Sequence, residues 1–123
     1  MRYLTDRKRA EGLGSAKSGT EHHWHMQVSA VGLAVLVPFF IFSFGSILGA
    51  THDEVVAYYS RPFPAIVAGL TLVVGMMHFK NGAQMMIEDY AHGFARKALI
   101  VSVICLCYAT MASGLFALIR LAL

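Results

Sequence analysis

Three long apolar runs, residues 28–50, 63–79 and 98–119, constrain what this chain can fold into more than any other feature of its sequence. None of the three runs contains Asp, Glu, Lys or Arg. A helix of about 20 predominantly apolar residues is long enough to cross the hydrocarbon core of a bilayer. Only 14% of the residues are charged, against about 25% in a soluble globular domain. The sequence therefore predicts an all-α membrane protein with three transmembrane helices in a heteromeric helix bundle.

The boundaries of the spans follow from the polar residues at their ends. The second run is the shortest, and we expect its helix to extend over 63–86 because Lys80 can snorkel toward the headgroups. Pro38 lies inside the first run, where it predicts a kink rather than a break if neighbouring helices cover the freed carbonyl. These boundaries divide the chain into a basic amino-terminal segment, residues 1–27, and one three-helix anchor domain, residues 28–123.

The distribution of positive charge predicts the orientation of the spans, since Lys and Arg near a span are retained on the cytoplasmic side. Of the ten Lys and Arg residues, all but Arg61 and Arg120 precede the first run or flank the second connection. We therefore expect the amino terminus inside and the carboxy terminus outside. A net charge of +3 in so apolar a chain indicates membrane orientation rather than nucleic-acid binding. No cleaved signal peptide is expected, because the charged segment before the first run is too long.

His78 is the outstanding residue for chemistry, because an ionisable side chain inside a span is costly and is a functional hypothesis by default. On a helix, Thr71, Gly75 and Gly82 project to the same side as His78, so a flat macrocycle has room on that face. Imidazole is a good axial ligand for haem iron, and a second ligand would have to come from another subunit. The alternatives are a histidine hydrogen-bonded to a neighbouring helix or one lying near the headgroups.

Asp89 and Tyr90 are the next candidates, at the inner end of the second span. If the helix continues, Asp89 returns to nearly the same face as His78, about 16 Å further along the axis. The phenolic hydrogen of Tyr90 could bind a carbonyl at the membrane surface, and a quinone presents such a carbonyl. The alternative is that both residues are simply interfacial, where tyrosine and acidic residues are common.

Two further groups of residues predict packing or interfacial roles rather than a site. His22, His23 and His25 lack the spacing of a closed zinc site, and Trp24 among them is expected to be an interfacial anchor. Cys105 and Cys107 point to nearly opposite sides of a helix and cannot pair there, so they are expected to pack as small apolar residues.

Gly45 and Gly49 have the small-residue spacing that lets another helix approach closely. The chain carries no nucleophile elbow, phosphate-binding glycine loop or iron-sulfur cysteine pattern. We therefore expect no independent catalytic activity from this chain.

Several of these motifs occur together in one family. They are a Gly-Ser-Ala-Lys-x-Gly-Thr run at residues 14–20, His23 with Trp24, Ser29 with Ala30, and the pattern from His78 through Gly82 to Asp89 and Tyr90. With them the chain resembles the small hydrophobic membrane-anchor subunit of succinate dehydrogenase (respiratory complex II) of the alphaproteobacterial and mitochondrial type. Many family members carry an Arg near the haem propionates just before the Ser/Thr-Ala pair. Here Gln27 and Val28 occupy those positions, so Gln27, His25 or the partner subunit would take over that contact.

The resemblance implies specific roles for three residues. His78 would be one axial ligand of haem b, with the other supplied by a histidine of the large cytochrome b subunit. Tyr90 would hydrogen-bond the ubiquinone carbonyl, with Asp89 near the site. FAD and the iron-sulfur clusters would belong to the flavoprotein and iron-sulfur subunits, which this chain helps to dock.

The implied location is the bacterial inner membrane, or the mitochondrial inner membrane if the source is eukaryotic. Two alternatives stay open. One is a fumarate reductase anchor working in the reverse direction. The other is a structural or transport-related small membrane protein with no redox role.

Overall fold

The computed structural model describes residues 5–6 and 21–123. From residue 21 onward the chain forms α2 (Glu21–Gly45), α3 (His52–Tyr59), α4 (Pro62–Tyr90) and α5 (Gly93–Ala122). Helices α2, α4 and α5 are long and apolar enough to cross a membrane, so the predicted fold of three apolar spans is confirmed. The basic residues at 2, 7–9 and 17 and the run at 14–20 lie outside the described residues. The orientation of the termini stays a prediction.

The helices are shifted and lengthened relative to the predicted spans. Helix α2 begins at Glu21 and ends at Gly45, whereas the apolar run covers 28–50. Helix α4 continues past the end of its apolar run to Tyr90, and helix α5 begins before its own run, at Gly93. Contact with lipid limits where polar side chains can lie. It does not stop the backbone hydrogen bonds of a helix at the headgroups, so a helix can continue beyond its apolar run. Helix α2 passes through Pro38 without a break, as expected.

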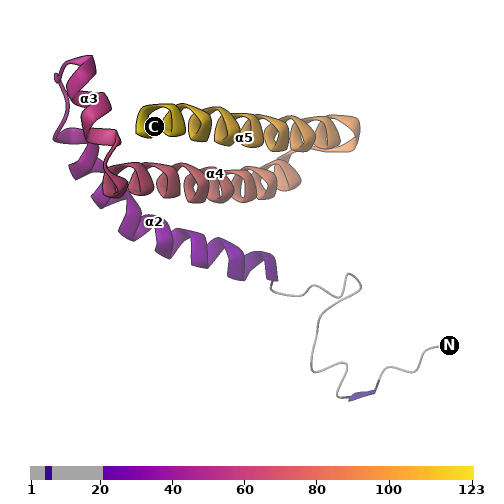
Figure 1. Ribbon diagram of the computed structural model, residues 1–123. Coiled ribbons are helices and arrows are strands. Elements are labelled where there is room, and N and C mark those ends of the chain that lie inside the picture. The colour runs from indigo at the N-terminus through magenta and orange to yellow at the C-terminus, as the bar shows by residue number, and fades with distance from the viewer. Residues whose placement is uncertain (1–4, 7–20) are drawn as a thin grey trace.

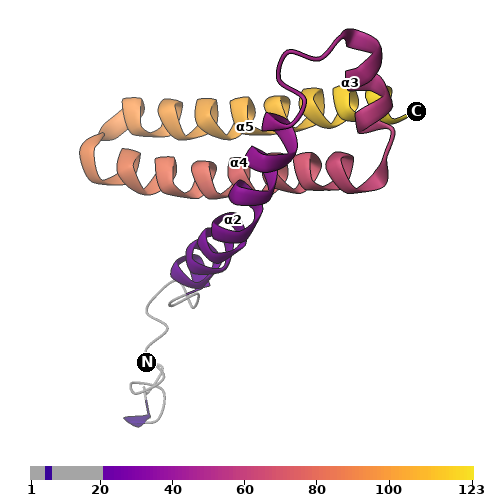
Figure 2. The ribbon, with the colours of Figure 1, turned by 90° about the vertical axis from the view of Figure 1, so that its left-hand side faces the viewer.

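Helix α4 is the middle element of the bundle. It contacts α2 on one side and α5 on the other, and within the described part of the chain the backbones of α2 and α5 do not approach each other. Helices α4 and α5 lie side by side and antiparallel, whereas α2 crosses α4 obliquely (Figures 1 and 2). The turn from α4 to α5 is short, and Gly93 begins α5 with a φ of 62°, a conformation that favours glycine.

Close packing between the helices depends on glycines other than the predicted pair. A Cβ added at Gly32 of α2 would lie 3.6 Å from Val74 of α4. Leu72 of α4 occupies the space that a Cβ at Gly114 of α5 would need. Small residues at such positions let backbones approach in a membrane, where no hydrophobic force drives helices together.

The prediction for Gly45 and Gly49 was wrong. Gly45 is the last residue of α2, and Gly49 lies in the following turn with a φ of 83°. The two residues therefore do not share a helix face. The apolar run continues past the end of α2, so hydropathy alone did not reveal where the helix stops.

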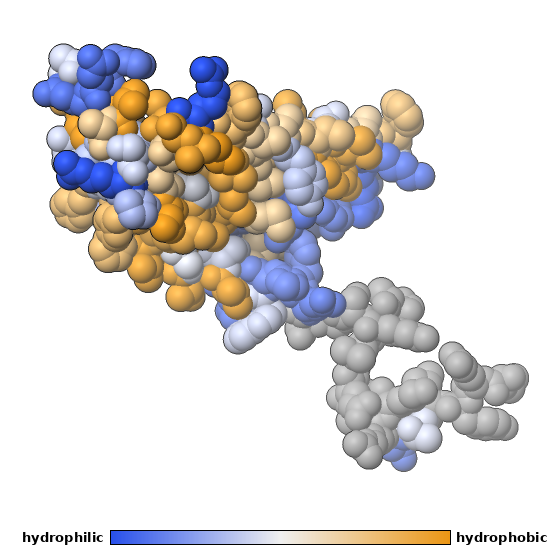
Figure 3. Space-filling view, viewed as in Figure 1, coloured by the Kyte–Doolittle hydropathy of each residue, from blue (hydrophilic) through white to orange (hydrophobic). Residues whose placement is uncertain are grey.

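Most apolar side chains of the three long helices face outward. Phe42 of α2 is 79% exposed and Leu106 of α5 is 66% exposed. In Figure 3 apolar residues cover the middle of the visible face, while hydrophilic residues gather over α3 and around the start of α2. Cys107 is fully buried and Cys105 is exposed, as expected for side chains two residues apart on a helix. Such an apolar exterior suits lipid or other membrane helices.

Helix α3 is an element that the analysis of apolar runs missed. It begins with a capping box: the Thr51 side chain accepts a hydrogen bond from the Glu54 backbone N–H, and the Thr51 N–H donates to Glu54 Oε2 at 2.8 Å. The Thr-x-x-Glu spacing is the sequence signature of such a start. The Thr51 N–H and the Thr51 hydroxyl, which donates to the same oxygen at 2.9 Å, hold the pKa of the Glu54 carboxyl below its ordinary value of 4.5.

The other end of α3 is tied to α2. The Tyr58 hydroxyl lies 2.9 Å from Ser43 Oγ, and the Ser46 hydroxyl donates to it at 3.5 Å. Hydrogen bonding to Ser43 and then Ser46 lowers the pKa of Tyr58 from 10.0. The connection from α2 to α4 is therefore a defined structure rather than a plain loop.

We expect Thr51→Ala to speed hydrogen exchange of the α3 amides by about fivefold, because losing a threonine N-cap costs about 1 kcal/mol. The lowered pKa of Glu54 determines in which direction the protection of the α3 amides changes with pH. Protection from the capping box is complete above pH 4.5 and is lost as the pH falls through the lowered pKa. Glu54→Gln should keep a cap without this acid sensitivity, because glutamine also fits the capping box.

A control for this measurement lies at the other end of α3. The Ser60 hydroxyl donates to the Ala57 carbonyl oxygen at 2.9 Å and takes no part in the capping box. Exchange mass spectrometry of the purified protein should therefore show little change in Ser60→Ala. Equal exchange rates in Thr51→Ala and Ser60→Ala would contradict the capping role.

Candidate functional site

His78 lies in the interior of α4 and is half-buried. Its Nδ1 atom is 2.8 Å from the Oγ atom of Ser29 on α2. The Ser29 hydroxyl also donates to the Met26 carbonyl oxygen, at 3.0 Å. The hydrogen bond to a neighbouring helix that the sequence left open is therefore present. It engages one ring nitrogen and leaves Nε2 without a recorded partner among the described residues.

Helical periodicity predicted an open face around His78 with room for a macrocycle. In the structure, side chains of α2 lie over the small residues of that face instead. A Cβ at Gly82 would lie 3.6 Å from Met26 Cε, and one at Gly75 would lie 3.8 Å from Leu33 Cδ2. The correction has a simple reason, since periodicity shows where bulk is missing but not which element fills the space. A ligand to His78 must therefore approach from the part of the ring that α2 does not cover.

At the carboxy-terminal end of α4, Glu88 has different surroundings from Asp89 and Tyr90. Glu88 accepts a hydrogen bond from Gln84 Nε2 at 2.9 Å and lies 4.0 Å from Arg96 of α5. Asp89 is exposed, and Tyr90 is 82% exposed. Neither of these two has a recorded hydrogen bond or ion pair within residues 21–123. Glu88 thus ties α4 to α5, whereas Asp89 and Tyr90 are available to a ligand or another subunit.

The histidines at the start of α2 do not form a metal centre with their described neighbours. His25 lies 3.7 Å from Glu21, one turn earlier on the same helix. Within the described part of the chain, no three His, Cys, Asp or Glu side chains gather closely enough to hold an ion. A metal bound by these histidines would therefore need at least one ligand from outside the described residues.

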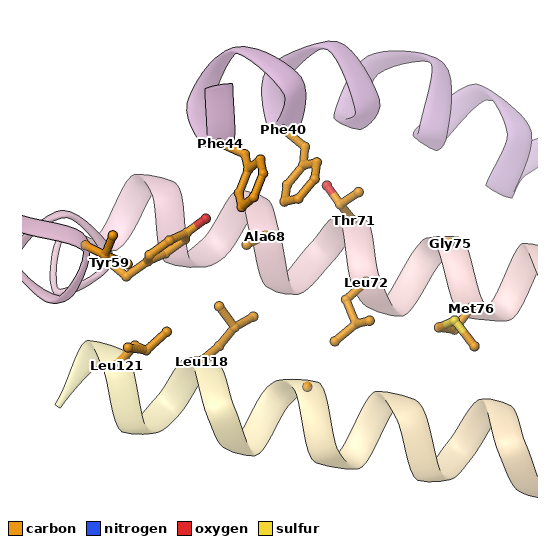
Figure 4. A pocket seen from close by; sticks show the side chains of 12 residues that line it. Phe40, Phe44, Tyr59, Ala68, Thr71, Leu72, Gly75, Met76, Leu118 and Leu121 are labelled. Carbon is orange, nitrogen blue, oxygen red and sulfur yellow. The ribbon is translucent and has the colours of Figure 1, made fainter. Parts of the chain in front are cut away.

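A cavity of about 570 Å³ opens between α2, α4 and α5 near α3. Figure 4 shows Phe40 and Phe44 of α2 above Ala68 and Thr71 of α4. The Thr71 hydroxyl, a polar group in this lining, donates to the Val67 carbonyl oxygen. The cavity therefore suits an apolar chain, and it lies toward the end of α4 remote from Tyr90.

Comparison with known proteins identifies the family. The sequence profile described as "Succinate dehydrogenase/Fumarate reductase transmembrane subunit" matches residues 1–117. The chain belongs to this family. It is 47% identical over 123 residues to the succinate dehydrogenase hydrophobic membrane anchor subunit of Paracoccus denitrificans. The aligned region covers 100% of this chain and 95% of the relative.

Two more distant members of the succinate dehydrogenase family also match. The hydrophobic membrane anchor subunit of Rickettsia conorii is 30% identical over 115 residues, covering 89% of each chain. The membrane anchor subunit of Reclinomonas americana is 32% identical over 90 residues, covering 71% of this chain and 73% of the relative. No solved structure gives a significant match. The resemblance inferred from the motifs is confirmed.

Family membership makes the chain a multi-pass membrane-anchor subunit of succinate dehydrogenase, an oxidoreductase complex. The surroundings of His78 fit one axial position of a haem. Metal-ligating histidines almost always donate their other ring N–H to a nearby acceptor, and the Ser29 oxygen lies at that position. Sequence reasoning missed the contact between Ser29 and His78, although a hydroxyl inside an apolar run was a signal for it.

Proposed function

We propose that this chain, as an anchor subunit of succinate:ubiquinone oxidoreductase, supplies one haem b ligand and part of the ubiquinone-reduction site. The observation that supports it most is His78, an ionisable residue inside a span with Nδ1 engaged and Nε2 available. The second axial ligand would come from a histidine of the large cytochrome b subunit. A bound haem b supplies reversible one-electron transfer within the membrane.

His78 contributes position as well as a lone pair. It lies on α4, which packs against helices on both sides, so its backbone is fixed more firmly than that of a peripheral helix. A ligand held in place before binding loses less conformational entropy when the metal arrives. The proposed haem site takes one ring nitrogen, Nε2 of His78, from this chain. The remaining ligand would come from another subunit.

Tyr90 would bind the quinone carbonyl at the inner membrane surface. It is the last residue of α4, and its exposure leaves the phenol free to donate a hydrogen bond. A donor at a carbonyl stabilises the negative charge that develops there as electrons arrive, so it favours reduction. Asp89 beside it is also exposed, so both side chains are accessible at this end of α4.

The inner end of the bundle would also dock the soluble partners. Arg96 and Lys97 at the start of α5 are exposed, and most other basic residues precede α2 in the sequence. Positive charge on this side supports an amino terminus inside and an inner surface that meets the iron-sulfur and flavoprotein subunits. FAD and the iron-sulfur clusters belong to those partners, and the membrane would be the bacterial inner membrane.

Co-purification tests this assignment at the level of the whole complex. We expect a tagged chain, extracted from its native membrane in mild detergent, to bring down a flavoprotein, an iron-sulfur protein and a second membrane subunit. The preparation should reduce ubiquinone with succinate. Faster turnover with fumarate and a reduced quinone would favour the fumarate reductase alternative. A chain that emerges alone and colourless would contradict the redox role altogether.

A further inference from the structure

We propose that Ser29 is a positioning residue for His78, and that its hydroxyl holds the imidazole in the tautomer that presents Nε2 to iron. The inference rests on the proposed ligation of haem by His78. It concerns a residue of α2, which the proposed ligand set does not include.

The two hydrogen bonds of Ser29 determine where the imidazole proton lies. The hydroxyl has one hydrogen, which it donates to the Met26 carbonyl oxygen at 3.0 Å. The contact of 2.8 Å to His78 Nδ1 is then satisfied only if Nδ1 carries a hydrogen and Ser29 Oγ accepts it. A neutral imidazole has one N–H, so a proton on Nδ1 leaves the lone pair on Nε2.

The packing of α2 on α4 brings the hydroxyl to this distance. Gly75 and Gly82 lie about one turn before and after His78, and they admit Leu33 and Met26 of α2. The contacts on both sides of His78 bring α2 close at the level of Ser29. In this partly buried, apolar setting the hydrogen bond is strengthened, and losing it leaves an unsatisfied N–H.

The hydrogen bond changes the ligand as well as its orientation. An acceptor on Nδ1–H raises the basicity of the imidazole, and outer partners of metal ligands are typically worth 10- to 100-fold in metal affinity. A more basic ligand favours ferric over ferrous iron. Loss of the Ser29 hydroxyl is therefore expected to raise the haem midpoint potential and to loosen the haem.

The test compares Ser29→Ala with the unmodified complex purified with all its subunits. We expect haem transfer to apomyoglobin to become at least about tenfold faster, the midpoint potential to rise, and the ferric low-spin electron paramagnetic resonance (EPR) signal to shift. Ser113→Ala is a matched control, because the Ser113 hydroxyl on α5 is exposed and donates to the Ala109 carbonyl oxygen of its own helix, at 2.8 Å. Ser29→Thr keeps the hydroxyl and should restore all three properties.

Three outcomes overturn the proposal. If Ser29→Ala behaves like Ser113→Ala in haem transfer, potential and EPR signal, the hydroxyl has no role at the haem. If Ser29→Thr is as impaired as Ser29→Ala, packing rather than the hydroxyl is responsible. In either case, loss of the low-spin signal in His78→Ala would leave the proposed function standing. The third outcome is an unchanged low-spin signal in His78→Ala, which would overturn both the role of Ser29 and the proposed function.

Discussion

In the purified complex, His78→Ala is expected to abolish the low-spin, bis-histidine haem b signal. Removing the imidazole removes an iron ligand outright, and even the outer partners of metal ligands contribute 10- to 100-fold in affinity. The haem-to-flavin ratio should therefore fall by more than about tenfold, or the remaining haem should become high-spin. Optical difference spectra and EPR of the same preparation measure both.

His52→Ala is the matched control for this variant. His52 begins α3, and its side chain is 84% exposed at the opposite end of the bundle from Tyr90. Its loss should leave the haem-to-flavin ratio and the low-spin signal unchanged. A bis-histidine signal of normal intensity in His78→Ala would show that the ligand lies elsewhere.

Tyr90→Phe should retain the haem and the partner subunits but reduce succinate:ubiquinone activity by about a hundredfold. One preorganised hydrogen-bond donor to a developing oxyanion is typically worth 10²–10³ in kcat. Succinate oxidation with a soluble artificial acceptor should continue at nearly the normal rate, because that reaction does not use the quinone site. A fall in kcat larger than the change in KM would show that the hydroxyl acts mainly as charge develops.

Tyr108→Phe supplies the comparison for Tyr90. Tyr108 lies on α5, and its ring is 5.9 Å from Lys80 Nζ. Replacing it by phenylalanine removes the same hydroxyl but keeps an aromatic ring beside the ammonium group. Quinone reduction should be unaffected. Equal losses in Tyr90→Phe and Tyr108→Phe would argue against a specific donor at position 90.

The apolar runs predicted the number and order of the long helices because lipid compatibility is a local property of the sequence. They did not predict the helix ends, since α2 stops at Gly45 within its run and α4 continues to Tyr90 beyond its own. Helix ends depend on capping and turn conformation, as the φ of 83° at Gly49 illustrates. Helix α3 was missed for a related reason: hydropathy does not report a capping box.

The candidate site was predictable to the extent that it lies on one helix. The continuous helix α4 carries His78, Asp89 and Tyr90, so their spacing along one axis followed from the sequence. The contact between Ser29 and His78 did not, because it depends on how α2 crosses α4. Periodicity identified the glycines beside His78, but only the pairing of helices showed that α2 fills the space over them.

The two connections of the bundle differ greatly in length, and this difference matches how the helices that they join are arranged. Only residues 91–92 separate α4 from α5, whereas residues 46–61, including α3, separate α2 from α4. A two-residue link keeps α4 and α5 side by side as an antiparallel hairpin (Figure 1). The longer connection leaves room for α2 to cross α4 obliquely (Figure 2). The contact of 2.8 Å between Ser29 and His78 therefore joins the crossing helix to the hairpin.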